Sequence, residues 1–158
     1  MTDFCSVTSH RITPGLLMAG LCLLIAACGG KEPACEAVQG TVAGRSVPVL
    51  NDAGVPTGFQ VEKATVAGSV AGTSSATFTV VRADEGGTMH LTGSHTFWDG
   101  ADQFLFRTRD EGQTTPDGRV ENQMTIIEGA TGSLTTTGAV DPKTGTLTLN
   151  YEGEVCRQ

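Results

Sequence analysis

Charged and aromatic residues are scarce in this sequence. Only 17% of its 158 residues are Asp, Glu, Lys or Arg, and only 5% are Phe, Trp or Tyr. The 10 basic residues form no cluster, and the formal net charge is −7 at pH 7. A nucleic-acid backbone is bound by clustered Lys and Arg that displace counterions. The composition therefore argues against a nucleic-acid partner, and the net charge favours solubility.

Helical periodicity is also missing, since no window of about 11 residues repeats apolar positions every three to four residues. Gly (21 residues) and Thr are frequent instead, which suits short strands joined by tight turns. Strand-like segments, separated by Gly, Pro, Asp or Asn, lie at 40–50, 58–70, 75–82, 87–97, 102–110, 119–129, 133–140 and 144–155. We predict an all-β fold, a barrel or a sandwich, and favour a single antiparallel barrel of about eight strands. Such a barrel has no exposed edges and has room for side chains or one small ligand.

The alternation is clearest in the last segment, where Leu147, Leu149 and Tyr151 fall on one face. The preceding residues, 141–145, are rich in turn formers, and 133–140 can supply the antiparallel partner. A C-terminal β-hairpin is therefore the firmest local prediction.

The N-terminal apolar run is too short to span a bilayer core as a helix, which takes about 20 residues. It covers 16–27, "LLMAGLCLLIAA", and Arg11 precedes it. This length is typical of the hydrophobic region of a secretory signal. The run ends in "LIAAC", which resembles the bacterial lipoprotein box. The resemblance implies cleavage before Cys28 and attachment of a diacylglycerol, and in some lipoproteins a further fatty acid such as palmitate, to that residue.

The chain is accordingly predicted to have three segments: a lipoprotein signal peptide at 1–27, a lipidated Cys28 and tether at 28–40, and a β-barrel domain at 41–158. Two or more acyl chains anchor a protein stably, so we expect a bacterial membrane to hold the domain, in the periplasm or at the cell surface. The same resemblance implies sorting to the outer membrane of a diderm organism, because Gly29, and not Asp, follows the cysteine.

The five cysteines can then be assigned. Cys5 and Cys22 would leave with the signal and Cys28 would be acylated, which leaves Cys35 and Cys156. Two cysteines in an exported domain favour one disulfide, which would contribute about 4 to 5 kcal/mol by closing so long a loop. Free or metal-bound thiols are the alternative, although no His lies near either cysteine at the spacing of a zinc site.

The region 102–156 resembles exported bacterial proteins with the barrel of allene oxide cyclase and the dirigent proteins. The resemblance rests on "FLFRTRDEG", "PDGRVENQMTII" and "GATGSLTTTGAVDPKTGTLTLNYEGEVC". It implies the same barrel fold and, as one possible function, a cyclase or isomerase. That activity would require at least two polar groups, such as His95 and Asn122, inside the cavity near the aromatic strand.

The histidines do not form a metal site in this reading. His90 and His95 are five residues apart on one strand, so their side chains face opposite sides and cannot hold one ion together. We predict no metal and no cofactor. His95 shares a face with Leu91 and Phe97, where a histidine is more often a core or rim residue, but its near-neutral pKa makes it the best acid–base candidate. No catalytic residue can be assigned.

Other charged residues are expected on the surface. Arg107 and Arg109 fall on the face opposite to the aromatic residues of their strand, where they can pair with acidic neighbours. Glu152 and Glu154 lie on the polar face of the last strand, so we expect both to be exposed. The stretch "TRDEG", 108–112, is interpreted as an ordinary charged strand end.

Apolar strand residues define a candidate pocket, together with two polar residues. Its members are Phe78, His95, Phe97, Phe104, Phe106, Asn122 and Met124. A packed core is the plain interpretation, because eight strands leave little spare volume. Trp98, in a turn, could cap the barrel or mark a binding rim. The favoured hypothesis is a non-catalytic module that binds a small apolar ligand or a surface partner, and the cyclase or isomerase is the alternative.

Overall fold

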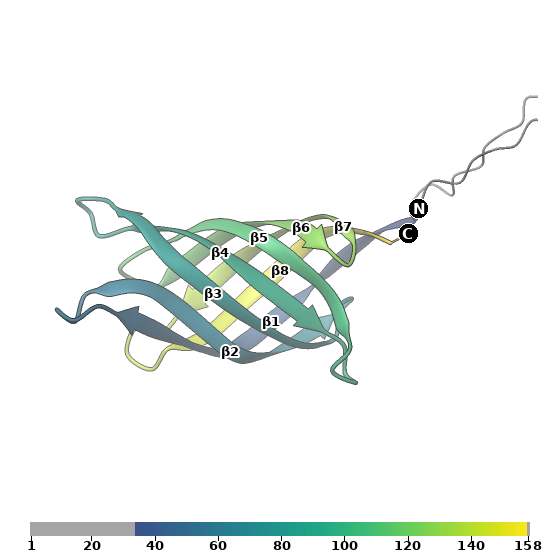
Figure 1. Cartoon of the computed structure of the whole chain (residues 1–158), viewed down its shortest axis with the longest axis horizontal. Coiled ribbons are helices and arrows are strands. Elements are labelled where there is room, and N and C mark those ends of the chain that lie inside the picture. The colour runs from purple at the N-terminus through teal and green to yellow at the C-terminus, as the bar shows by residue number, and fades with distance from the viewer. Residues whose placement is uncertain (1–33, 158) are drawn as a thin grey trace, which may run out of the picture. The chain divides into compact units, whose positions relative to one another are not determined.

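The computed structural model describes residues 34–157, which form eight antiparallel strands (Figure 1). The strands are β1 Ala34–Leu50, β2 Pro56–Gly68, β3 Gly72–Ala83, β4 Met89–Trp98, β5 Phe104–Thr114, β6 Arg119–Glu128, β7 Thr131–Val140 and β8 Thr146–Arg157. Each strand pairs with the next along the chain, and β8 pairs with β1, so the sheet closes into a barrel. Closure gives every strand two neighbours and hides the edges that an open sheet would expose.

Within these residues the predicted all-β barrel of eight strands is confirmed, with one correction at its start. The sequence predicts a tether up to residue 40, but β1 begins at Ala34 and pairs with β8 from that residue onward. The first seven residues of β1, "ACEAVQG", are mostly small or polar and show little alternation. Their strand conformation comes from pairing with the end of β8, which is distant in sequence.

Two predictions fall outside the described residues: the signal peptide at 1–27 and the lipidation of Cys28. In the part of the chain that is described, no helix is long and apolar enough to cross a membrane.

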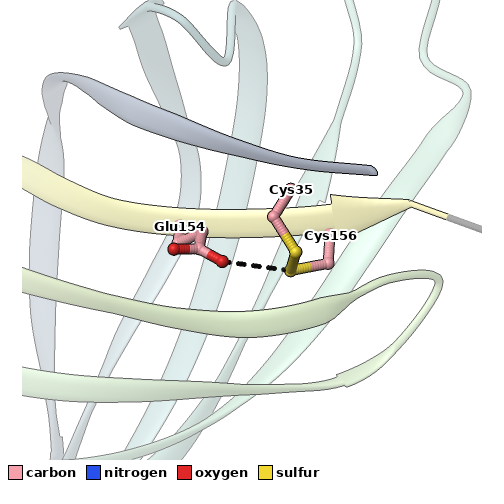
Figure 2. A group of neighbouring side chains, drawn as sticks. All are labelled: Cys35, Glu154 and Cys156. Atoms are coloured by element: carbon pink, nitrogen blue, oxygen red, sulfur yellow. Dashed lines mark hydrogen bonds between the residues drawn. A yellow bond between two sulfur atoms is a disulfide. The ribbon is translucent and has the colours of Figure 1, made fainter. Parts of the chain in front are cut away.

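The predicted disulfide joins the first strand to the last. Cys35 and Cys156 lie directly opposite each other on β1 and β8, and their sulfur atoms are bonded at 2.15 Å (Figure 2). The bond links residues 121 positions apart, so it adds a covalent closure to the hydrogen-bonded seam of the barrel. The alternative of two free thiols does not apply to this state of the protein.

Side-chain oxygens organise several of the turns between strands. Asn51, Asp99 and Asp141 each follow a strand, and an oxygen of each side chain accepts a hydrogen bond from the backbone N–H two residues later, at 2.8 to 3.0 Å. Such contacts replace backbone hydrogen bonds in tight turns. They explain why the Asn and Asp residues in the sequence mark the strand boundaries well.

Side chains close the end of the barrel where β1 begins and β8 ends, which we call the closed end. There the loop between β2 and β3 folds inward and places Val70 against Tyr151. The Val70 N–H donates to the Tyr151 hydroxyl at 2.8 Å, and this hydroxyl donates to the Val70 carbonyl at 3.1 Å. Both residues are only 3% exposed. This end is therefore filled by packed side chains; the Tyr151 hydroxyl is paired with Val70, whereas the buried Ser74 hydroxyl has no partner in the protein.

Candidate functional site

A cavity of about 60 Å³ lies inside the barrel at the other end. Its walls come from the last residues of odd-numbered strands and the first residues of even-numbered strands, which meet at the end opposite to Ala34 and Arg157. Most of the wall is apolar and includes Phe59, Phe78, Leu91, Val120, Val140 and Leu147. One water molecule occupies about 30 Å³ in the liquid, and pockets for drug-sized ligands measure about 300 Å³ or more. The cavity therefore suits a molecule or terminal group of a few heavy atoms.

His95 lies at the inner side of this cavity. It is 3% exposed, and its ring stacks on Phe97 with the centroids 4.5 Å apart. Burial disfavours the charged imidazolium and lowers the pKa of His95 to about 4, from 6.5. Its Nε2 atom is buried and has no hydrogen-bond partner in the protein. At neutral pH the side chain of His95 is therefore an uncharged imidazole whose Nε2 atom has no hydrogen-bond partner in the protein.

Asp110 lies beside His95 and is completely buried. Its Oδ2 atom lies 3.9 Å from Nδ1 of His95 and accepts a hydrogen bond from Nδ2 of Asn122 at 3.3 Å, and its Oδ1 atom accepts one from the Thr108 hydroxyl. Burial is the largest influence on this carboxyl and raises the pKa of Asp110 to about 6, against the weaker opposite effect of the two hydrogen bonds. Asp110 is thus mainly ionised at pH 7 and mainly protonated at pH 5.

Asn122 and Thr136 belong to the polar side of the cavity, which also includes Ser46, Gln113, Thr114 and Glu121. Asn122 and Thr136 lie directly opposite each other on β6 and β7, and they are 8% and 1% exposed. Because Nδ2 of Asn122 donates to Asp110, its Oδ1 atom is left as an acceptor, and neither this oxygen nor the Thr136 hydroxyl has a partner in the protein. Gly112, opposite Asn122, makes room for this arrangement, since a Cβ at Gly112 would lie 2.8 Å from Oδ1 of Asn122.

Three residues that line the cavity therefore each carry a buried polar atom without a partner in the protein: Nε2 of His95, Oδ1 of Asn122 and the hydroxyl of Thr136. A buried polar group without a hydrogen bond costs about 1 to 3 kcal/mol. Such groups are normally paired with protein or with ordered water. A water molecule or a ligand in the cavity would pair with them, and the apolar wall beside them suits the apolar part of a ligand.

The predicted pocket is brought together only in part. Phe78, His95 and Asn122 line the cavity. Phe97, Phe106 and Met124 are at most 2% exposed but belong to the packed core and not to the cavity wall.

The prediction that Phe104 lies in the pocket, on the same strand face as Phe106, is wrong: Phe104 is 42% exposed, whereas Phe106 is 1% exposed. The reason is an irregular register, because Phe97 pairs with Phe106 while the adjacent Trp98 pairs with Phe104. The shift breaks the two-residue alternation at the start of β5. Trp98 is half-buried at the end of β4, which lies at the closed end of the barrel and not beside the cavity.

Sequence reasoning missed Asp110, Thr108 and Thr136. The interpretation of "TRDEG" as a charged strand end is wrong, because β5 continues to Thr114 and buries Asp110 completely. A signal was present, since Phe106, Thr108 and Asp110 continue one alternating face. Thr136 gives no such signal, because its neighbours are also threonines.

The remaining charged residues lie where the sequence predicts. His90 faces outward from β4 and binds Asp84, with Nε2 and Oδ2 2.9 Å apart, while His95 faces inward. Arg107 and Arg109 are exposed, and Arg107 pairs with Glu128 at 2.9 Å.

Among the described residues, one group of ligand-type side chains is close enough to share a metal ion: Cys35, Glu154 and Cys156 (Figure 2). Glu154 is exposed, as predicted, and its Oε1 atom lies 3.3 Å from Sγ of Cys156. The two sulfur atoms are bonded to each other, and metal binding needs thiolates. This group is therefore part of the disulfide seam and not a metal centre in the oxidised protein.

Comparison of the chain with models of protein families, with curated proteins and with solved structures finds no match in any of the three. The resemblances to the lipoprotein box and to the allene oxide cyclase barrel therefore rest on the quoted residues alone.

Proposed function

We propose that the chain is an exported, lipid-anchored binding module whose barrel takes up one small, largely apolar molecule. The observation that carries this proposal is the cavity itself: a small apolar space inside the barrel on which three buried polar atoms have no protein partner. An apolar wall beside unpaired polar atoms suits a small molecule that has an apolar body and a hydrogen-bonding group.

The position of the cavity agrees with anchoring through Cys28. That cysteine precedes the first residue of β1 by six positions, and six extended residues reach about 20 Å at most. Because β1 begins at the closed end of the barrel, an anchor there would keep the closed end near the membrane. The cavity, at the opposite end, would face away from the lipid and stay accessible to small molecules.

The binding proposal is tested by native mass spectrometry of the chain purified from its own host. We expect the wild-type chain to carry an additional small mass that is lost on unfolding. Ala76 lines the cavity and is 4% exposed, so Ala76→Leu should fill the space and abolish the additional mass without removing a polar group. A wild-type chain without any bound mass, or an equal mass on the Ala76→Leu variant, would contradict the proposal.

A second candidate is an acid–base isomerase or cyclase. The placement of His95 and Asn122 at one cavity, with Asp110 behind His95, favours it, because an uncharged His95 can accept a proton at Nε2 and return it to another atom of the same substrate. Such a reaction needs no co-reactant. The two candidates differ in one result: a binding module releases its ligand unchanged, whereas an isomerase converts it, and the His95→Gln variant would lose that conversion.

A further inference from the structure

We infer that the cavity recognises a hydroxyl group at the inner end of a small neutral molecule. This inference deepens the proposed binding function and rests on it. The ligand would be an alcohol with a short apolar body. Its chemical class follows from the buried polar atoms that have no hydrogen-bond partner in the protein.

Two of the three unpartnered atoms are acceptors. Asn122 is held in one orientation because its Nδ2 donates to Asp110, which leaves Oδ1 facing the cavity as an acceptor. For His95, the carboxylate 3.9 Å from Nδ1 favours the tautomer that carries its proton there. In an uncharged imidazole the other nitrogen, Nε2, is then an acceptor. A ligand that satisfies these atoms must bring a hydrogen-bond donor.

The third atom, the Thr136 hydroxyl, can donate as well as accept. A ligand hydroxyl pairs with two of the three atoms, because it donates its one hydrogen to Asn122 or His95 and accepts a hydrogen bond from Thr136. An ether oxygen can only accept, so it would leave both acceptors unpaired. A hydrocarbon would leave all three atoms unpaired.

Charge excludes the two ionic alternatives. A carboxylate or phosphate would face two acceptors, with the buried Asp110 behind them. An ammonium group at the inner end would find no carboxylate there: Glu121, which also lines the cavity, is exposed to solvent and already accepts a hydrogen bond from Gln113, and Asp110 does not line the cavity. Transfer of an unpaired charge into an apolar space is strongly unfavourable. The site therefore fits a neutral donor.

The size of the space limits the body of the ligand. About 60 Å³ accommodates a few heavy atoms, and the walls beside Leu91, Val140 and Leu147 are apolar. A short alkanol fits entirely, and a longer alcohol could enter with its hydroxyl first.

The test compares two isomers of equal atom count, 1-butanol and methyl propyl ether. The full chain, reconstituted in lipid nanodiscs and labelled with 15N in histidine and 13C in methyl groups, is titrated with each probe and observed by NMR. Empty nanodiscs give the free concentration of the probe. We expect 1-butanol to bind at least about tenfold more tightly than the ether, the difference expected for a missing hydrogen bond in a dry site. The Nε2 signal of His95 should be that of an unprotonated nitrogen and should move with the alcohol only.

Thr136→Val removes the inner hydroxyl with little change of volume, and Thr137→Val is its matched control, since Thr137 is the next residue and faces solvent. We expect the first variant to weaken 1-butanol binding about tenfold and the second to leave it unchanged. The methyl spectrum without probe shows whether each variant is folded.

The outcomes separate the two levels of the proposal. Equal binding of both isomers would overturn the hydroxyl assignment and leave the binding function standing. If neither 1-butanol nor methyl propyl ether bound, both the hydroxyl assignment and the proposed binding function would be overturned. A preference for the alcohol that persists in Thr136→Val, with no movement of the His95 signal in the wild-type chain, would place the hydroxyl elsewhere and overturn the assignment.

Discussion

The burial of His95 and Asp110 predicts how the free energy of unfolding depends on pH. Between about pH 4 and pH 6, the folded protein holds one proton on Asp110, whose pKa is raised to about 6, and none on His95, whose pKa is lowered to about 4. The unfolded chain holds one proton on His95, with a pKa near 6.5, and none on Asp110, with a pKa near 3.8. The two states bind the same number of protons, so the pair adds no pH dependence to folding.

Substitution of either residue should reveal the pH dependence that the other one adds to the free energy of unfolding. In Asp110→Asn, the unfolded chain binds one proton more than the folded protein, so stability falls as the pH is lowered from 6.5 to 4. In His95→Gln, the folded protein binds one proton more, so stability rises as the pH is lowered from 6 to 4. One pKa unit corresponds to about 1.4 kcal/mol, so each change amounts to about 3 kcal/mol over its range.

Urea unfolding at pH 4, 5, 6 and 7, followed by circular dichroism with the disulfide intact, measures these changes as differences from the wild-type chain. Subtraction of the wild-type curve removes the contribution of other titrating groups. Thr137→Val, which alters no titratable group, serves as a control and should follow the wild type. If both variants had the same sign of slope, or if neither differed from the wild type, the assignment of neutral His95 and ionisable Asp110 would be refuted.

Two further predictions concern the covalent features of the chain. The double variant Cys35→Ser with Cys156→Ser should lower the free energy of unfolding by about 4 to 5 kcal/mol, because the disulfide closes a loop of 121 residues; an unchanged urea midpoint would argue that the barrel seam alone determines stability. Cys28→Ser should abolish incorporation of radiolabelled palmitate, and continued labelling would contradict lipid attachment at that residue.

Much of the barrel could be predicted from sequence because its rules are local. Inward and outward residues alternate along each strand, and turn formers such as Asn51 and Asp99 stand at the boundaries. The start of β1 could not be predicted, because residues 34–40 become a strand only through pairing with distant β8. Phe104 was misplaced for a similar reason, since the irregular register between β4 and β5 leaves no local trace.

The polar side of the cavity was harder to predict because burial of a charge opposes the usual preference for the surface. His95 and Asn122 could be proposed from their apolar neighbours on the strand. Asp110 lies between Arg109 and Glu111, which are exposed, so its surroundings in sequence suggest a surface position. Only the register of the closed barrel shows that Asp110 supports Asn122 and His95 from behind.

A crystal structure of the protein soaked with 1-butanol shows whether the interior cavity binds a small molecule through its hydroxyl group. We expect electron density for the alcohol inside the barrel, with its oxygen within hydrogen-bond distance of Oδ1 of Asn122 or Nε2 of His95 and its carbon atoms beside Leu91 and Val140. A cavity that holds only ordered water at saturating alcohol would contradict this expectation.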